Sequence, residues 1–334
     1  MLGLLLGFFR RSSLYKRKWG EAMIRMFRTI ENTIQQVSEG AEGCWIALTD
    51  PTASELIEVA SSYQIDIDHL KAPLDEEERS HIEVEEDYTM IIVDIPVTEE
   101  RKEKEYYVTI PCGIIITKEN IITICLEDSP ILEGFMDGRV RNFWTYRKTR
   151  FFLQILNRNA AMYLQYLRMI DKKSDEVEKK LHISTKNQEL IELLELEKSL
   201  VYFTTSLRSN EVVLERMLKI EAIKKYPEDE ELLEDVIIEN KQAIEMADIY
   251  SNILSGTMDA YASVISNNLN IVMKVLAVIT IIMSIPTMIA SFWGMNVSVP
   301  FENSGSIFGF VIILVAALIA CIFCIILLRK KDML

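Results

Sequence analysis

Four small hydroxyl-bearing residues recur at steps of four, three and four along an apolar stretch near the C-terminus: Thr280, Ser284, Thr287 and Ser291. In a helix this spacing places all four side chains on one face. The same rhythm continues towards the N-terminus through Ala277, Met273, Asn270, Ser266, Ala262 and Asp259. Small hydroxyl residues let membrane helices pack closely. The continuation to polar side chains beyond the apolar stretch instead favours a helix face that lines a water-filled channel.

The stripe ends in a short connection, SFWGMNVSVPFEN (291–303), which contains Gly294, Met295 and Asn296. It has no lysine or arginine, and Glu302 is its only charged residue. A glycine lets the backbone turn sharply, and an asparagine offers a neutral amide oxygen. The aromatic residues just before the glycine are typical of an anchor at a membrane interface.

Two apolar runs flank this connection, and each is long enough to cross a membrane. Residues 275–293 are uncharged over 19 residues, and residues 307–328 form a second run of 22. The first run alone gives about 30 Å of helix, one hydrocarbon thickness. Lys274 precedes the first run and the basic residues 329–331 follow the second. Because basic residues favour the cytoplasmic side, we expect both termini in the cytoplasm and the connection outside. Two spans cannot enclose a pore, so a conduit needs several copies around an axis.

The part of the chain before these runs begins with an alternation of strands and helices. GCWIALTD (43–50) is typical of a strand, and PTASELIEVASSYQ (51–64) is typical of a helix with Asp50 as its N-cap. The break at residues 118–120 predicts a hairpin between two runs rich in Ile, Val, Thr and Tyr. This pattern indicates an α/β domain.

After Arg139 the apolar spacing is helical throughout, with dense charges of both signs. It predicts two long antiparallel helices and then a third that starts at Pro227. Gly256 is the only glycine or proline between Glu228 and Ile285, so the third helix is expected to continue unbroken as the first span. Its length would be about 100 Å.

These observations predict an α+β membrane protein with a cytoplasmic α/β domain, coiled-coil-like long helices and a C-terminal two-helix transmembrane hairpin. The expected segments are an N-terminal arm (1–40), the α/β domain (41–138), the antiparallel helices (139–226), the stalk helix with the first span (227–293, membrane part from about 272), the external connection (294–306), the second span (307–328) and a basic cytoplasmic tail (329–334). Met23 or Met26 is an alternative first residue to Met1.

Charge and motifs disfavour several classes of function. A net charge of −14 argues against nucleic acid, since binding it requires a basic face. No P-loop, nucleophile elbow or zinc-protease motif is present, so we expect neither an enzyme nor an organic cofactor. Cys321 and Cys324 lie inside the second span and are expected to be small packing residues instead of a redox or metal pair. The scattered histidines His69, His81 and His182 are expected to be structural.

The segment SNNLNIVMKVLAVITIIMSIPTMIASFWGMN (266–296) resembles the pattern of the CorA-type divalent cation channels, in which Gly-Met-Asn follows the first of two C-terminal spans. ERSHIEVEEDYTMIIVDIP (78–96) and the basic tail fit the same family, so the resemblance extends from about residue 40 to the end. It implies a funnel-shaped homopentamer embedded in the lipid of the cytoplasmic membrane. The first spans would line the pore, and the second spans would form an outer ring.

The resemblance also implies roles for individual residues. Gly294, Met295 and Asn296 would form the outer selectivity ring, and Glu302 keeps an acid at the matching place of the external loop. Pore-lining positions would be Asn270, Met273, Leu276, Ser284 and Thr287, with Asp259 near the cytoplasmic mouth; the stripe adds Thr280 and Ser291. Three features depart from the family. Ser284 is smaller than the methionine that some relatives carry, so an apolar gate would rest on Met273 and Leu276. Trp293 stands where a tyrosine is usual, and VSVPFEN replaces the commoner loop with Met-Pro-Glu.

The family transports Mg²⁺ and often Co²⁺ or Ni²⁺, whereas its ZntB-like members move Zn²⁺. Mg²⁺ gives up its water reluctantly, so a ring of neutral Asn296 amide oxygens suits recognition of the hydrated ion and its release. We therefore expect a passive Mg²⁺ channel driven by the membrane potential. A Zn²⁺ transporter, proton-coupled or not, is the first alternative. A membrane-anchored signalling or scaffold protein is the second, and it leaves the stripe and Gly-Met-Asn unexplained.

Gating by cytosolic Mg²⁺ is the expected regulation. Mg²⁺ bridging acidic residues of neighbouring subunits would cancel their repulsion and hold a closed state. Asp235 aligns with a sensor position of the family, and Asp75 is its expected partner. A solvated acidic face is the alternative.

Overall fold

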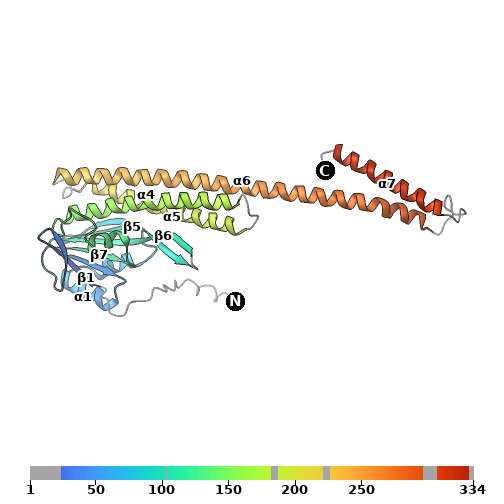
Figure 1. The fold of residues 1–334 in the computed structure, drawn as a ribbon. Helices are drawn as coiled ribbons and strands as arrows, with labels where there is room; N and C mark the ends of the chain where they lie inside the picture. Colours follow the sequence, from blue (N-terminus) through green and yellow to red (C-terminus); the bar gives the residue numbers. More distant parts are fainter. Residues whose placement is uncertain (1–23, 102–103, 182–186, 221–225, 296–306, 331–334) are drawn as a thin grey trace. The chain divides into compact units, whose positions relative to one another are not determined.

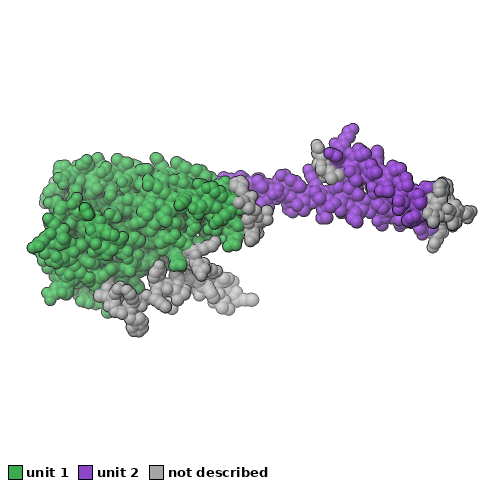
Figure 2. All heavy atoms as spheres, viewed as in Figure 1, with its two compact units in different colours: residues 1–254 green, residues 255–334 purple. Residues whose placement is uncertain are grey.

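The structure is a computed structural model that describes residues 24–101, 104–181, 187–220, 226–295 and 307–330 (Figure 1). It forms two compact units, one up to Leu254 and one from Ser255 (Figure 2). The elements are β1 (Ile24–Ile30), β2 (Thr33–Val37), β3 (Trp45–Thr49), α1 (Ala53–Tyr63), α2 (Ile67–Lys71), η1 (Ala72–Leu74), β4 (His81–Val84), β5 (Tyr88–Arg101), β6 (Lys104–Thr117), β7 (Ile121–Cys125), α3 (Pro130–Met136), α4 (Lys148–Leu181), α5 (Asn187–Met217), α6 (Pro227–Trp293) and α7 (Ile307–Lys330).

The first unit is built on a seven-stranded sheet with the order β2-β1-β3-β7-β6-β5-β4. β3 and β7 pair in parallel, and the other neighbours pair antiparallel. The hairpin predicted at residues 118–120 is confirmed, because β6 and β7 pair across it and the Thr117 N–H donates to the Asn120 carbonyl at 2.9 Å. The sheet therefore joins segments far apart in sequence around the parallel pair.

Strands β1 and β2 lie in the part of the chain that the sequence assigned to an N-terminal arm, so in the structure the domain begins at Ile24 instead of near residue 41. β1 pairs with β3 and packs the Phe27 ring on Trp45, with 5.2 Å between ring centroids. Glu31 and Asn32 join β1 to β2 with positive φ at both positions, as in a two-residue hairpin turn. This short turn was not predicted from the sequence. Without β1, the edge of β3 would have no pairing strand.

Helices cover both faces of the sheet because side chains alternate along each strand. On β5, Ile91, Val93 and Ile95 enter the core that includes α3, α4, α5 and the start of α6. Met90 and Ile92, on the opposite face, pack with α1 and α2. This arrangement gives three layers, helix–sheet–helix, and the predicted N-terminal α/β domain is confirmed.

The N-cap of α1 is Thr52, and the prediction of Asp50 was wrong. Thr52 and Glu55 form a capping box: the Glu55 carboxylate accepts from the Thr52 N–H at 2.7 Å, and the Thr52 hydroxyl accepts from the Glu55 N–H at 3.4 Å. Asp50 instead extends the β3–β7 pairing, since its N–H donates to the Cys125 carbonyl at 3.0 Å. The reciprocal pair satisfies two free N–H groups, which a single aspartate two residues earlier cannot do.

Long helices pack side by side in the first unit. The rings of Tyr163 on α4 and Phe203 on α5 meet edge to face at 5.1 Å. The Asn240 amide of α6 donates to the Leu207 carbonyl of α5 at 3.1 Å. α6 is one helix of 67 residues that contains Pro286.

A buried polar cluster surrounds Asp94 in the middle of β5. Asn159, Tyr163 and Asn210 donate to its backbone carbonyl at 2.8–3.2 Å. Burial raises the pKa of the Asp94 carboxyl to about 6, although hydrogen bonds from Ser206 and Ser80 oppose the shift. The folded protein therefore binds this proton more tightly than the unfolded chain does. The contribution of the protonated Asp94 carboxyl to the stability of the folded protein is complete below about pH 4, and it is lost as the pH rises through about 6.

We expect Asp94→Asn to stabilise the protein at pH 7.5, because it removes a buried charge whose ionisation costs on the order of 2–3 kcal/mol. The gain should disappear near pH 4.5, where the native carboxyl is already protonated. Thermal unfolding of the purified protein at both pH values measures this difference. Equal effects of the substitution at the two pH values would contradict the assignment.

Candidate ion pathway

Two helices in the described part of the chain are long and apolar enough to cross a membrane: α6, through its C-terminal portion, and α7. Their apolar portions belong to the second unit. Within the described residues both apolar portions are largely uncovered, and large apolar side chains are exposed along both. This exposure is expected for helices that meet lipid or further copies of the chain.

α6 contacts α7 through one face. Val278 is only 2% exposed, and the next positions that are partly buried follow at helical spacing: Ile282, Ile285, Ile289 and Trp293. α7 contributes the buried residues Gly309 and Leu328, and half-buried Cys321 and Cys324 lie between them at helical spacing. Cys321 and Cys324 thus face α6, in keeping with the packing role expected from the sequence.

The hydroxyl stripe lies on the opposite face of α6. Thr280 follows Val278 by two residues, about 200° around a helix, and the other stripe residues keep this offset. All four stripe residues are exposed in the single chain: Thr280, Ser284, Thr287 and Ser291. The stripe therefore does not pack α6 against α7, and the hairpin leaves it free for a path or for another subunit.

Three stripe hydroxyls use their protons within α6. The hydroxyl of Thr280 donates to the Leu276 carbonyl at 2.8 Å, that of Ser284 to Ile281 at 2.8 Å, and that of Thr287 to Met283 at 3.1 Å. A hydroxyl has one proton and two lone pairs, so each oxygen keeps acceptor capacity outward. Such a row of acceptors can hydrogen-bond the water around a cation without a fixed charge.

Pro286 interrupts the hydrogen bonds of α6, and α7 compensates. Proline has no N–H, so the carbonyl of Ile282, four residues earlier, lacks its helical donor. The Cys321 thiol donates to this carbonyl with 3.7 Å between sulfur and oxygen. In an apolar surrounding a neighbouring helix commonly satisfies the freed group. Cys321 therefore fixes the register of α7 against the proline.

The remaining pore-lining candidates on α6 are exposed, in a stretch where the neighbouring residues are exposed as well. Asp259, Asn270, Met273 and Leu276 are exposed, the last two by 59% and 64%. Gly294 ends α6, and its N–H donates to the Ala290 carbonyl at 3.0 Å. Met295 is exposed. Asn296 and Glu302 lie outside the described residues.

The two residues expected to sense metal lie on different elements of the first unit. Asp75 follows η1, where its carboxylate accepts from the Glu77 N–H at 3.1 Å, and it is exposed. Asp235 is exposed on α6. Burial and the nearby Asp235 carboxylate raise the pKa of Glu239, one turn further along. Negative charge is thus concentrated around Asp235.

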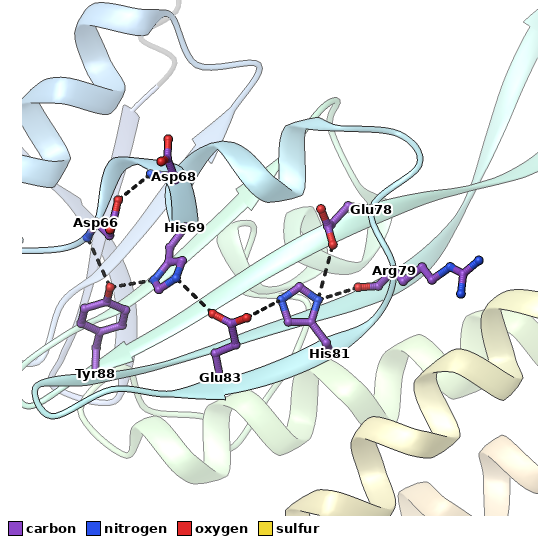
Figure 3. Close-up of polar contacts among 8 residues, drawn as sticks. All are labelled: Asp66, Asp68, His69, Glu78, Arg79, His81, Glu83 and Tyr88. Carbon is purple, nitrogen blue, oxygen red and sulfur yellow. Dashed lines mark hydrogen bonds and ion pairs between the residues drawn. The ribbon is translucent and has the colours of Figure 1, made fainter.

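A second group of possible ligands was not predicted. His69, Glu83 and Glu85 each offer one ligand atom, and these atoms lie within 4.8 Å of one another. Figure 3 shows His69 of α2 facing Glu83 of β4. The sequence analysis considered each histidine separately and did not predict this group. The signal it missed was the alternation His81-x-Glu83-x-Glu85, which places three polar side chains on one face of a strand.

Comparison with known proteins identifies the family. A family model described as CorA-like Mg²⁺ transporter protein matches residues 40–330. The chain belongs to this family. It is 29% identical over 301 residues, 87% of this chain and 92% of the relative, to the cobalt/magnesium transport protein CorA of Methanocaldococcus jannaschii. It is therefore a divalent cation transporter of the CorA family, whose members are transporters and not enzymes.

Solved structures agree on the fold. The complete CorA magnesium transporter from Methanocaldococcus jannaschii superposes with a TM-score of 0.80 at 23% identity and covers 94% of this chain and 99% of that chain. The ZntB cytoplasmic domain from Vibrio parahaemolyticus reaches 0.56 at 11% identity, with 75% and 99% covered. At these identities both likenesses show the fold alone. The superposition on the complete CorA structure confirms the predicted arrangement of an α/β domain, a long helix and a C-terminal apolar helix.

The two faces of α6 predict different access to water. In a background with Cys321→Ser and Cys324→Ala, we expect Thr287→Cys to react with a charged thiol reagent about tenfold faster than Ile289→Cys, because the thiolate forms in water and not in an apolar contact. Labelling in proteoliposomes measures both rates. Equal protection of both cysteines would place the stripe against lipid and contradict the assignment.

The role of Cys321 is tested by stability. We expect Cys321→Ala to lower the free energy of unfolding by about 1 kcal/mol, since it leaves the Ile282 carbonyl without a donor. Cys321→Ser should retain the stability, because a hydroxyl can donate to the same carbonyl. Thermal unfolding in detergent compares them with Cys324→Ala, and an equal loss in both alanine variants would show that only packing matters.

Proposed function

We propose that the chain forms a homopentameric channel in the cytoplasmic membrane that conducts hydrated Mg²⁺, with Co²⁺ and Ni²⁺ as further ions. One observation supports this most: the row of oxygen-bearing side chains on α6 faces away from α7. In a ring of subunits, α7 would then be peripheral and the stripes would converge on the axis. Five copies agree with the family resemblance stated above.

The proposed selectivity ring consists of Asn296 together with Gly294. Mg²⁺ demands octahedral oxygen coordination and loses water reluctantly, so a carboxylate ring that stripped the ion would release it slowly. Neutral amide oxygens can hydrogen-bond the hydrated ion as a whole. Below the ring, the acceptor oxygens of Thr287, Ser284 and Thr280 offer weak, repeated contacts, and conduction requires such contacts because the ion must also leave.

The membrane potential drives entry in this proposal. The basic residues 274 and 329–331 orient both termini to the cytoplasm, so Gly294 lies at the outer end of α6. An inside-negative potential contributes about 2.3 kcal/mol per charge per 100 mV, and a divalent ion gains about twice that amount. A narrow apolar stretch at Met273 and Leu276, both highly exposed on the stripe side, would close the path.

Cytosolic Mg²⁺ is proposed to control that closure through Asp235 and Asp75. The raised pKa of Glu239 reflects burial and the neighbouring Asp235 charge, and a bound cation would relieve such repulsion. Mg²⁺ held between Asp235 of one subunit and Asp75 of the next would favour a symmetric closed state. Its loss would let the subunits separate and the path widen.

The selectivity ring is tested by Asn296→Ala in proteoliposomes with a membrane potential. We expect Mg²⁺ uptake to fall about tenfold or more. The substitution removes a hydrogen bond of about 1 kcal/mol in each subunit, and the sum over several subunits is more than a tenfold change requires. Asn303→Ala, the same change in the same connection, should transport like the wild type.

Uptake of Mg²⁺, Co²⁺ and Zn²⁺ by the wild type separates the proposed ion from the alternative. Preference for Zn²⁺, or uptake that follows an imposed proton gradient, would favour the ZntB-like transport mode. Unchanged uptake of all three ions by Asn296→Ala would refute the selectivity ring. Inhibition by cobalt hexaammine checks that the hydrated ion is recognised.

A further inference from the structure

The group formed by His69, Glu83 and Glu85 lies on the edge of the sheet in the first unit, away from the transmembrane helices in sequence. One ring nitrogen of the histidine and one oxygen of each carboxylate lie within 4.8 Å of one another. Tetrahedral ligands at zinc-like bond lengths of about 2.0–2.2 Å are roughly 3.4 Å apart. Small side-chain movements are therefore enough to bring the three atoms around one ion.

Short, hydrogen-bonded elements position these side chains. β4 pairs with β5 at the edge of the sheet, with Glu83 opposite Met90. The Glu85 N–H donates to the Tyr88 carbonyl at 2.9 Å and fixes the turn that follows β4. His69 belongs to α2, whose N-cap Asp66 accepts from the Asp68 N–H at 2.9 Å. The backbone of each candidate ligand is thus held independently of any ion.

The Nδ1 atom of His69 has a hydrogen-bond partner. Metal-binding histidines commonly have such a partner on the nitrogen that does not bind the metal. His69 Nδ1 lies 2.7 Å from the Tyr88 hydroxyl, which also accepts from the Asp66 N–H at 3.3 Å (Figure 3). A tyrosine hydroxyl can accept from Nδ1–H or donate to Nδ1, so this contact is compatible with either tautomer of His69. In the tautomer with the proton on Nδ1, Nε2 keeps a lone pair that can bind a metal ion.

The other nitrogen faces a carboxylate. His69 Nε2 lies 3.0 Å from Glu83 Oε2. Nε2 can donate to this carboxylate when it carries the proton, or its lone pair can join the carboxylate in binding a metal ion. His81 flanks the second Glu83 oxygen, with 3.6 Å between His81 Nε2 and Glu83 Oε1. The histidine and the two carboxylates thus converge on one point.

We propose that His69, Glu83 and Glu85 bind a first-row transition-metal ion of the Zn²⁺ or Co²⁺ class, with water in the remaining position. An imidazole and two carboxylates suit these ions, whereas Mg²⁺ prefers oxygen ligands alone in octahedral geometry. The site therefore discriminates against Mg²⁺ and binds transition-metal ions instead. Two carboxylates balance the charge of a divalent ion.

The surface beside this site favours cations. An open depression of about 820 Å³ begins at Asp68, next to His69, and is lined by four successive acidic residues, Asp75 to Glu78. Concentrated negative charge raises the local concentration of cations and their rate of association. The depression supplies ions to the site but lacks the imidazole that selects among them.

Co²⁺ binding to the purified full-length protein in detergent, in excess MgCl₂, tests the proposal. The d–d absorption of bound Co²⁺ and isothermal titration with CoCl₂ and ZnCl₂ are the readouts. We expect His69→Gln and Glu85→Gln each to weaken the affinity of this site on the order of tenfold or more, and Tyr88→Phe by about tenfold. Glu86→Gln, the same change at the exposed next residue, should bind like the wild type.

Several outcomes overturn the proposal. These are a His69→Gln spectrum identical to the wild type, displacement of Co²⁺ by Mg²⁺, or equal weakening by Glu86→Gln. Thermal unfolding without metal identifies variants that fail to fold, and Glu85→Gln then carries the test if His69→Gln is unstable. The site is independent of the proposed Mg²⁺ path. Asn296→Ala should retain this Co²⁺ spectrum, and His69→Gln should retain Mg²⁺ uptake in the absence of transition metals.

Discussion

The packing of α7 on one face of α6 is the constraint on which the membrane part of this molecule depends. Val278 and Ile282 occupy the contact, and Cys321 satisfies the carbonyl that Pro286 leaves without a donor. Once this face is used, the hydroxyl stripe half a turn away has no partner within the described part of the chain. A helix with one apolar face packed and one oxygen-bearing face free can be completed only by water, lipid or further subunits. Lipid is the least suitable of these for a row of acceptor oxygens.

The fold of the first unit follows from a second constraint, the burial of both faces of one sheet. Apolar residues on both faces of β5 force helices onto each side, and α6 begins as part of one of these cores through Leu233 and Val236. The helix that supplies the transmembrane stripe is therefore anchored at its start in the domain that carries the acidic residues. A change of packing around Asp235 acts on the same helix as the proposed gate residues. The proposed coupling between the region of Asp235 and the gate residues therefore rests on one helix that both share, and not on a chain of separate contacts.

Sequence patterns predicted the features that local physics determines. Uncharged length predicts spans, period-two alternation predicts strands, and the step of three and four predicts the stripe. The strands β1 and β2 were not predicted, because the two-residue turn that joins them, Glu31 and Asn32, contains no glycine to indicate a hairpin. Asp50 was preferred over Thr52 as a cap because the reciprocal bond to Glu55 depends on side-chain geometry. The group at His69 joins this histidine to two glutamates 14 and 16 positions later in the sequence, and only the pairing of β4 with β5 and the position of α2 bring them together.

The chain offers divalent cations two donor sets of opposite character, and this difference gives each a separate role. The α6 stripe presents neutral oxygens whose protons are held by backbone carbonyls, a surface that suits an ion surrounded by its water. The group on α2 and β4 presents an imidazole between a phenol and a carboxylate, a surface that suits an ion stripped of most of its water. Weak contacts with a hydrated ion permit passage, and direct ligation permits discrimination. A transporter that selects mainly by hydration cannot by itself separate Mg²⁺ from transition-metal ions of similar size and charge. A nitrogen ligand on the first unit would supply the chemical distinction that the proposed path lacks.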